Sequence, residues 1–162
     1  MERAIFPGTF DPVTLGHLDI VRRGRGIFDR ILVAVARQRE KQVLFSVEER
    51  VAMIQEATAD LPGIEVESFE GMLVDFARAR NARAVIRGLR VISDFEYEFQ
   101  MALMNRRLDD QIESVFLMPS ERYIYLNSTV VREIARLGGP IEGFVPPGVA
   151  HKLRERFPGV RR

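Results

Sequence analysis

The amino-acid sequence predicts an α/β fold: a Rossmann-like, doubly wound, five-stranded parallel sheet in a single domain. Short apolar runs alternate along the chain with amphipathic segments, and most of these runs are nearly continuous, as is typical of strands covered on both faces. The length of 162 residues suits one domain with a substantial core. We therefore treat residues 1–162 as one domain.

The predicted strands are separated by segments with helical periodicity. Crossovers of this kind are right-handed and join parallel strands. A Pro7-Gly8 turn is expected after the first strand, followed by a helix whose first turn carries His17. The predicted strands are Ala4–Phe6, Ile31–Ala36, Ile64–Val66, Ala84–Ile86 and Val115–Met118.

Local signals mark the helices. Ser46–Glu49 and Ser93–Glu96 each place a serine three residues before a glutamate, the pattern of a capping box at a helix start. Phe95, Tyr97 and Phe99 in the helix after the second box are expected to serve the core and an interface. The remaining helices are predicted over Leu73–Ala79, from Asn127 or Ser128 to the stop at Gly138-Gly139-Pro140, and over Val149–Phe157.

Composition excludes several classes of protein. The net charge of +1 argues against a nucleic-acid binder, which must neutralise many phosphates. No apolar run approaches the roughly 18 residues of a membrane span. The chain has no cysteine, which fits a cytoplasmic location. Its two histidines, His17 and His151, are not in metal-ligand spacing, so no metal site built from the protein alone is expected.

Polar residues follow four of the predicted strands. Because ligands in such folds bind beyond the carboxyl ends of the strands, these residues should meet at one edge of the sheet. Cations, hydroxyls and helix N-termini gathered there suit a polyphosphate and a second anionic substrate. The residues concerned are Thr9 and His17; Arg37, Arg39 and Lys41; Arg87, Gly88 and Arg90; and Ser120 with Tyr123–Thr129.

Three blocks of sequence resemble the bacterial phosphopantetheine adenylyltransferases over nearly the whole chain. The first runs from Pro7-Gly8-Thr9-Phe10-Asp11-Pro12 to Gly16-His17, and the third is Ser128-Thr129-Val130-Val131-Arg132. Both are shared across the nucleotidylyltransferase superfamily. The second block is specific to the family: Ile86-Arg87-Gly88-Leu89-Arg90, then Asp94-Phe95-Glu96-Tyr97-Glu98.

The resemblance implies a reaction. ATP and 4′-phosphopantetheine would give dephospho-coenzyme A and pyrophosphate by direct in-line attack, with Mg²⁺ as cofactor and without a covalent enzyme intermediate. A phosphate monoester has a second pKa of about 6, so the nucleophile is already largely dianionic at neutral pH. Positioning and electrostatic stabilisation should therefore supply most of the catalysis.

The resemblance also assigns roles to residues. Lys41 and Arg87 would hold the phosphate of phosphopantetheine, and Leu73 would contact its arm. Thr9 and His17 would bind the reacting α-phosphate, with His17 stabilising the transition state. Lys41 is placed by its spacing from Phe45, because the loop Arg37–Gln42 departs from the family pattern. ATP would be bound by Thr9, Phe10, His17, Gly88, Leu89, Arg90, Glu98, Tyr123, Ile124, Tyr125, Leu126, Asn127, Ser128 and Thr129.

The resemblance further implies a homohexamer and feedback binding of coenzyme A. Three alternatives stay open at this point. The chain could be another nucleotidylyltransferase, acting on nicotinamide mononucleotide or on glycerol phosphate. It could be a sensor that binds ATP without releasing pyrophosphate, or a purely structural module. The Arg87–Glu98 block argues against another nucleotidylyltransferase, and the presence of a second phosphate site argues against a sensor.

Overall fold

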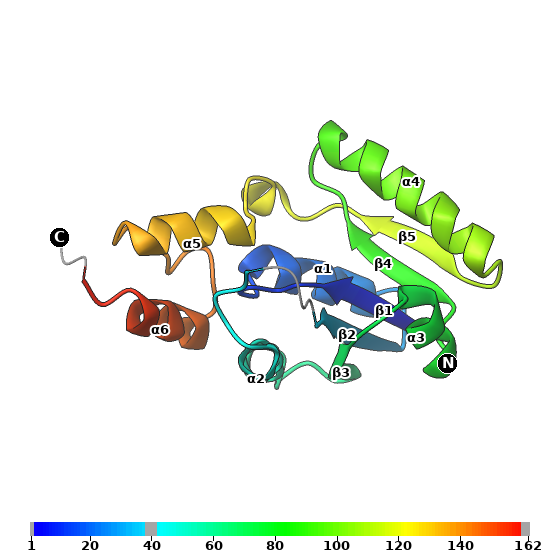
Figure 1. Cartoon of the computed structure of the whole chain (residues 1–162), viewed down its shortest axis with the longest axis horizontal. Coiled ribbons are helices and arrows are strands. Elements are labelled where there is room, and N and C mark those ends of the chain that lie inside the picture. The colour runs from blue at the N-terminus through cyan, green and yellow to red at the C-terminus, as the bar shows by residue number, and fades with distance from the viewer. Residues whose placement is uncertain (1, 38–41, 160–162) are drawn as a thin grey trace.

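Five parallel strands form one sheet in the order β3-β2-β1-β4-β5, as Figure 1 shows. The computed structural model describes residues 2–37 and 42–159, apart from the side chains of residues 92 and 93. The chain builds β1, β2 and β3 outward on one side, then returns to the centre to add β4 and β5 on the other. This confirms the predicted doubly wound fold. The strands are β1 (Arg3–Gly8), β2 (Arg30–Ala36), β3 (Ile64–Phe69), β4 (Ala84–Gly88) and β5 (Glu113–Leu117).

Strands β1 and β4 are longer than predicted at their carboxyl ends. Pro7 and Gly8 belong to β1 rather than to a turn, and both are in register with β2. The pairing of β1 with β4, in contrast, stops at Ile5 and Val85. The two central strands therefore continue past the end of their mutual ladder, which opens a crevice between them at the point where the strand order reverses.

The helices confirm most of the predicted starts. Ser46 and Glu49 form the expected capping box, with N···O distances of 2.9 and 3.1 Å. The box predicted at Ser93 is wrong, because the helix begins at Ile92 with Val91 as N-cap, which offers no side-chain acceptor. The helices are α1 (Leu15–Arg25), α2 (Val47–Ala57), α3 (Leu73–Ala79), α4 (Ile92–Leu108), the 3₁₀ turn η1 (Glu121–Tyr123), α5 (Ser128–Arg136) and α6 (Pro147–Arg156).

The final helix, α6, starts earlier than predicted. Pro147 and Gly148 lie inside it, not before it, with Pro147 at its first position. Proline suits that position, because its fixed φ is already helical and its missing N–H would have no partner there. The prolines therefore mark the start of the helix where we expected a loop.

The three inner strands of the sheet, β1, β2 and β4, are buried on both faces, as their apolar runs predicted, whereas the edge strands β3 and β5 are only partly buried. Alternate residues of β1 point to opposite sides: Ala4 and Phe6 join one core cluster and Ile5 joins another. The first cluster is packed by residues of α1, α2, α5 and α6, and the second by residues of α3. The central strands are thus covered by helices on both sides, which leaves their carboxyl ends as the accessible edge.

A glycine in α1 lets this helix lie close to the sheet. A Cβ atom added to Gly24 would lie 2.7 Å from Cδ1 of Ile31 and 3.0 Å from Cδ1 of Ile86. Such distances are too short for carbon atoms in contact. Gly24 therefore carries a packing role that outweighs the helix propensity it costs.

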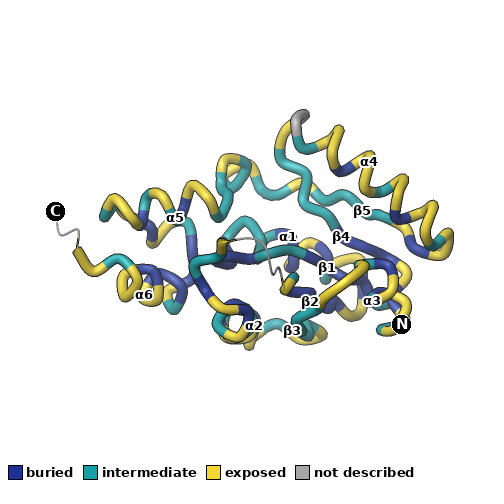
Figure 2. The backbone as a smooth tube through the Cα atoms, viewed as in Figure 1, coloured by how far each residue is buried: buried dark blue, intermediate teal, exposed yellow. Residues whose placement is uncertain are grey.

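Helix α4 packs along β5 and leaves most of its apolar side chains exposed (Figures 1 and 2). Phe95 and Phe99 stack on each other at 5.6 Å between ring centroids, yet each is nearly half exposed. The expectation that Phe95, Tyr97 and Phe99 serve the core is wrong for this chain taken alone. Within the described residues, no helix is both long and apolar enough to cross a membrane.

Candidate active site

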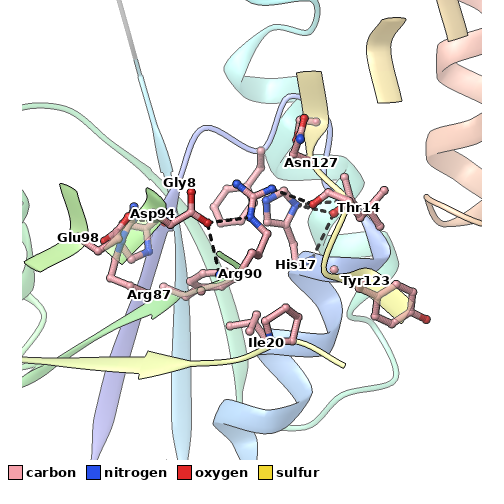
Figure 3. A pocket seen from close by; sticks show the side chains of 18 residues that line it. Gly8, Thr14, His17, Ile20, Arg87, Arg90, Asp94, Glu98, Tyr123 and Asn127 are labelled. Atoms are coloured by element: carbon pink, nitrogen blue, oxygen red, sulfur yellow. Dashed lines mark hydrogen bonds and ion pairs between the residues drawn. The ribbon is translucent and has the colours of Figure 1, made fainter. Parts of the chain in front are cut away.

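A cavity of about 230 Å³ lies at the carboxyl ends of β1 and β4. Its position is the crevice that the reversal of strand order opens, where ligands of doubly wound folds bind. Figure 3 shows Arg87 with Glu98 on one side of this cavity and His17 with Thr14 on the other. The lining residues are Phe6, Pro7, Gly8, Phe10, Thr14, Gly16, His17, Ile20, Arg87, Gly88, Arg90, Asp94, Glu98, Pro119, Tyr123, Leu126, Asn127 and Ser128.

His17 is fixed by the start of α1. Thr14 is the N-cap, and its Oγ1 accepts the backbone N–H of His17 at 3.3 Å. In return, the backbone N–H of Thr14 donates to Nδ1 of His17 at 3.0 Å. A histidine thus takes the place that glutamate or glutamine holds in an ordinary capping box. Since Nδ1 must accept, the proton of the neutral ring is on Nε2, which makes Nε2 a hydrogen-bond donor.

The ring of His17 stays neutral at physiological pH. Burial, and then the positive charges of Arg90 and Arg87, lower the pKa of His17 from 6.5 to about 4. The ring of Phe10 packs edge-on against the imidazole at 4.9 Å between centroids. An anionic ligand would oppose the effect of the two arginines, because an opposite charge nearby favours the protonated ring.

Arg87 extends from β4 across the crevice. Its Nε and Nη2 each donate to a carboxylate oxygen of Glu98 at 2.7 Å, and its Nη1 donates to the carbonyl of Pro7 at 3.1 Å. Glu98 comes from α4 and is buried. The guanidinium therefore bridges the two strands where their backbone ladder has ended.

Arg90 links the crevice to the segment before α5. Its Nη1 donates to the carbonyl of Leu126 at 2.9 Å, and its Nε lies 3.3 Å from Oδ2 of Asp94. Asn127 is the N-cap of α5, accepting the N–H of Val130 at 2.8 Å, and the hydroxyl of Ser128 donates to the carbonyl of Pro12 at 2.7 Å. The N-terminus of α5 therefore borders the cavity, as the sequence predicted.

A second cavity of about 450 Å³ adjoins the first. Arg87 and Glu98 line both, as do Pro7 and Gly8. Phe69, Leu73 and Met101 give the second cavity an apolar part of its lining. Its other lining residues are Thr9, Ala36, Tyr97, Ala102, Asn105 and Ser114.

The structure brings together most of the predicted residues. Thr9 and Leu73 line the second cavity rather than the first. Leu89, Ile124, Tyr125 and Thr129 line neither, and the side chain of Tyr125 is exposed. Lys41 and Arg39 fall outside the described residues. The predicted residues that line the first cavity are Phe10, His17, Arg87, Gly88, Arg90, Glu98, Tyr123, Leu126, Asn127 and Ser128.

The sequence did not reveal the residues that hold the loop between β1 and α1 (residues 9–14) in place. Buried Asp11 accepts the N–H groups of Leu44 and Phe45 at 2.8 and 2.9 Å. Buried Arg50 donates to the carbonyls of Thr9, Ala36 and Phe45. No local pattern reveals most of these contacts, because all but the one between Arg50 and Phe45 join residues at least 14 positions apart. The Thr14–His17 box, in contrast, could have been found from its three-residue spacing.

Comparison with known proteins gives this site a family. The chain matches the family model described as cytidylyltransferase-like over residues 5–134, a range that contains both cavities. In overall fold it is similar to the crystal structure of a putative nicotinate-nucleotide adenylyltransferase from Vibrio parahaemolyticus (TM-score 0.72, 16% identity, 99% of this chain and 98% of that chain covered). It is also similar to a bifunctional NMN adenylyltransferase/ADP ribose pyrophosphatase from Francisella tularensis (TM-score 0.72, 15% identity, 95% and 49% covered).

Much closer sequence similarity covers the chain almost from end to end. It is 54% identical to the phosphopantetheine adenylyltransferase of Moorella thermoacetica, with 97% of this chain and 98% of that protein covered. It is 52% identical to the protein of the same name from Caldanaerobacter subterraneus subsp. tengcongensis, with the same coverage. The residues at the crevice and the identity across the whole domain lead to one assignment: the chain belongs to the phosphopantetheine adenylyltransferases, a family of nucleotidyltransferase enzymes.

Proposed function

We propose that this enzyme transfers the adenylyl group of ATP to 4′-phosphopantetheine, giving dephospho-coenzyme A and pyrophosphate. The observation that carries the proposal is the pair of adjoining cavities with Arg87 and Glu98 in their common wall. A reaction between two phosphorylated substrates needs two sites that meet at one point. The names of the relatives at 52–54% identity supply the substrates.

The first cavity fits ATP. Nε2–H of His17 is a neutral hydrogen-bond donor suited to an oxygen of the α-phosphate. Its hydrogen bond to that oxygen can strengthen as negative charge develops there in the transition state. The N-terminus of α5, with Ser128 and Thr129, and the guanidinium of Arg90 suit the β- and γ-phosphates. Gly88, Tyr123 and Leu126 offer the apolar walls for the adenosine.

The second cavity fits the acceptor. Arg87 would hold its phosphate at the shared wall, next to Thr9 of the first loop. The apolar stretch that includes Leu73 suits the pantetheine arm. We assign Lys41, which lies outside the described residues, to the same phosphate from its sequence spacing before Phe45.

The proposed chemistry is a direct displacement. A phosphate oxygen of the acceptor forms a bond to the α-phosphorus of ATP, and the bond from that phosphorus to the α,β-bridging oxygen breaks. The electron pair leaves with pyrophosphate. His17 is a poor nucleophile here, because Nδ1 is occupied by Thr14 and Nε2 carries the proton. The chain also has no cysteine. Both facts favour a reaction without a covalent enzyme intermediate.

We propose that Mg²⁺ enters with ATP. The two acids of the first cavity are each paired with an arginine, Asp94 with Arg90 and Glu98 with Arg87. Within residues 2–37 and 42–159, no cluster of three or more acidic, histidine or cysteine side chains is placed to hold a metal. Mg²⁺ often keeps several waters and binds through substrate phosphates, where it neutralises charge. The site fits an ion carried by the nucleotide.

We further propose a cytoplasmic homohexamer that coenzyme A can inhibit. The exposed apolar side chains of α4, including Phe99, Leu103 and Met104, are of the kind that a subunit interface covers. Coenzyme A resembles the product in carrying both a pantetheine arm and an adenine nucleotide. It should therefore compete for the two cavities.

Pyrophosphate release tests the assignment. The enzyme with ATP and Mg²⁺ should release pyrophosphate when 4′-phosphopantetheine is added and not when nicotinamide mononucleotide or glycerol phosphate is added. Release with nicotinamide mononucleotide instead would move the enzyme to another branch of the superfamily. ATP binding without release for any of the three acceptors would support a sensor.

A further inference from the structure

One wall of the nucleotide cavity has little regular structure. Residues 118–127 connect β5 to α5 and contain only the short turn η1. They nevertheless give the cavity four of its lining residues, Pro119, Tyr123, Leu126 and Asn127. A segment without strand ladders depends on side-chain contacts for its position. We call residues 118–127 the nucleotide wall.

The far end of the nucleotide wall is anchored by contacts already described. Arg90 binds the carbonyl of Leu126, and Ser128 binds the carbonyl of Pro12 just beyond the wall. Both contacts lie at the α5 end. The β5 end needs an anchor of its own, and Asp19 on α1 supplies it.

The carboxylate of Asp19 accepts two hydrogen bonds from Ser120. Oδ2 of Asp19 accepts the backbone N–H of Ser120 at 2.6 Å, and Oδ1 accepts its hydroxyl at 2.9 Å. Arg23, one turn along α1, binds both residues. Its Nε donates to Oδ2 of Asp19 at 3.0 Å, and its Nη2 donates to the Ser120 hydroxyl at 2.8 Å. Burial raises the pKa of Asp19, but the hydrogen bonds from Ser120 and Arg23 outweigh it and hold the pKa below its usual value.

Backbone hydrogen bonds connect Ser120 to the rest of the nucleotide wall. The carbonyl of Ser120 accepts the N–H of Tyr123 at 2.9 Å, and the carbonyl of Tyr123 accepts the N–H of Leu126 at 3.0 Å. Tyr123 also packs beside α1, where a Cβ added to Gly16 would lie 3.7 Å from Cβ of Tyr123. Helix α1 therefore sets both sides of the cavity: its first turn carries His17, and its next turn carries Asp19.

We propose that Asp19 is a positioning residue for nucleotide binding, acting through Ser120 to hold the nucleotide wall at the right distance from His17. The second cavity provides the contrast. Its lining residues within the described part of the chain include none from 118–127. Loss of Asp19 should therefore weaken ATP binding and leave the acceptor site intact. This inference rests on the proposed function, which identifies the nucleotide as ATP.

The test compares Asp19→Ala with Asp60→Ala, which removes an exposed acid in the turn after α2. We expect Asp19→Ala to raise the dissociation constant of ATP about tenfold by calorimetry, the effect of losing a charged hydrogen bond. The KM for phosphopantetheine should change less than about twofold on the same scale. Asp60→Ala should change neither value.

Two further variants separate positioning from general stability. Asp19→Asn should keep part of the affinity for ATP, because its amide oxygen can still accept the Ser120 N–H. Ser120→Ala in the Asp19→Ala background should weaken ATP binding much less than Asp19→Ala does in the wild type, since only the contact of the hydroxyl with Arg23 is left to lose. Equal losses for ATP and phosphopantetheine, or a lower melting temperature with unchanged ATP affinity, would overturn the inference.

ATP calorimetry also keeps this test apart from the proposed function. A wild-type enzyme that binds ATP but releases no pyrophosphate with phosphopantetheine would refute the proposed reaction. The ratio of ATP dissociation constants between wild type and Asp19→Ala would still decide the role of Asp19. A ratio near ten supports it, and a ratio near one refutes it.

Discussion

Arg87 and Glu98 form a two-pronged ion pair, with both N···O distances at 2.7 Å, in the wall between the two cavities. A guanidinium has five N–H donors. Two of them bind Glu98 and a third binds the carbonyl of Pro7, so two remain for an anion. The pair thus fixes the plane of the guanidinium and determines which of its edges an anion can reach.

Replacing Arg87 with lysine should impair the acceptor site. A lysine ammonium is a point charge and cannot make the two-pronged contact with Glu98. We expect Arg87→Lys to raise the KM for phosphopantetheine by about tenfold or more, as for the loss of a charged hydrogen bond. Arg83→Lys, an exposed position just before β4, is the control and should behave as wild type. An unchanged KM in Arg87→Lys would argue against phosphate binding by Arg87.

Removing His17 should affect the chemical step more than ATP binding. In the proposed reaction the Nε2–H donor would face charge that develops in the transition state, and loss of such a donor lowers kcat by about 100-fold to 1,000-fold. We expect this for His17→Ala, with a much smaller change in the KM for ATP. His151→Ala removes the other histidine, which is exposed, and should leave both constants unchanged. A near-normal kcat in His17→Ala would contradict the assigned role.

The lowered pKa of His17 should also appear in the pH dependence of stability. Between about pH 4 and 6.5, the unfolded chain binds a proton that the folded protein does not. The stability that neutral His17 contributes is therefore complete above pH 6.5 and is lost as the pH falls towards 4. His17→Gln keeps a capping-box residue but does not titrate. The difference in unfolding free energy between wild type and His17→Gln should decline in this window; parallel curves would show that the pKa is not lowered.

Buried Arg50 should matter for stability. It donates to three backbone carbonyls, those of Thr9, Ala36 and Phe45. Arg50→Met would leave these acceptors without their donor, and we expect a loss of about 3 kcal/mol in chemical denaturation. Arg22→Met on the exposed face of α1 should cost little. A loss below about 1 kcal/mol in Arg50→Met would mean that water replaces the guanidinium.

Charge on the apolar face of α4 should break the proposed assembly. Phe99 and Leu103 are each about half exposed and lie one turn apart. Phe99→Glu and Leu103→Glu should shift sedimentation from the hexamer towards smaller species. Gln111→Glu adds the same charge at an exposed position in the turn between α4 and β5 and should keep the assembly. If the wild-type chain sediments as a monomer, the face has another purpose.

Much of the site could be predicted because its signals are local. Apolar runs located all five strands, and the residues at their carboxyl ends include His17, Arg87 and Arg90. The Ser46–Glu49 box was correct because both partners lie within one turn. Local signals gave the wrong start for two helices. Helix α4 begins one residue before the serine that was expected to cap it, and α6 begins at a proline that suggested a loop.

The sequence by itself determined the type of fold, the edge of the sheet where ligands bind and most of the groups that would meet them. Only the tertiary structure decided the strand order, the crevice beyond Ile5 and Val85, and the contacts that hold the site in shape. Asp19 and Ser120 are 101 residues apart, and Arg50 and Thr9 are 41 apart. The sequence signals that mark helices and strands lie among near neighbours, whereas these contacts arise only when the packed core brings distant segments together.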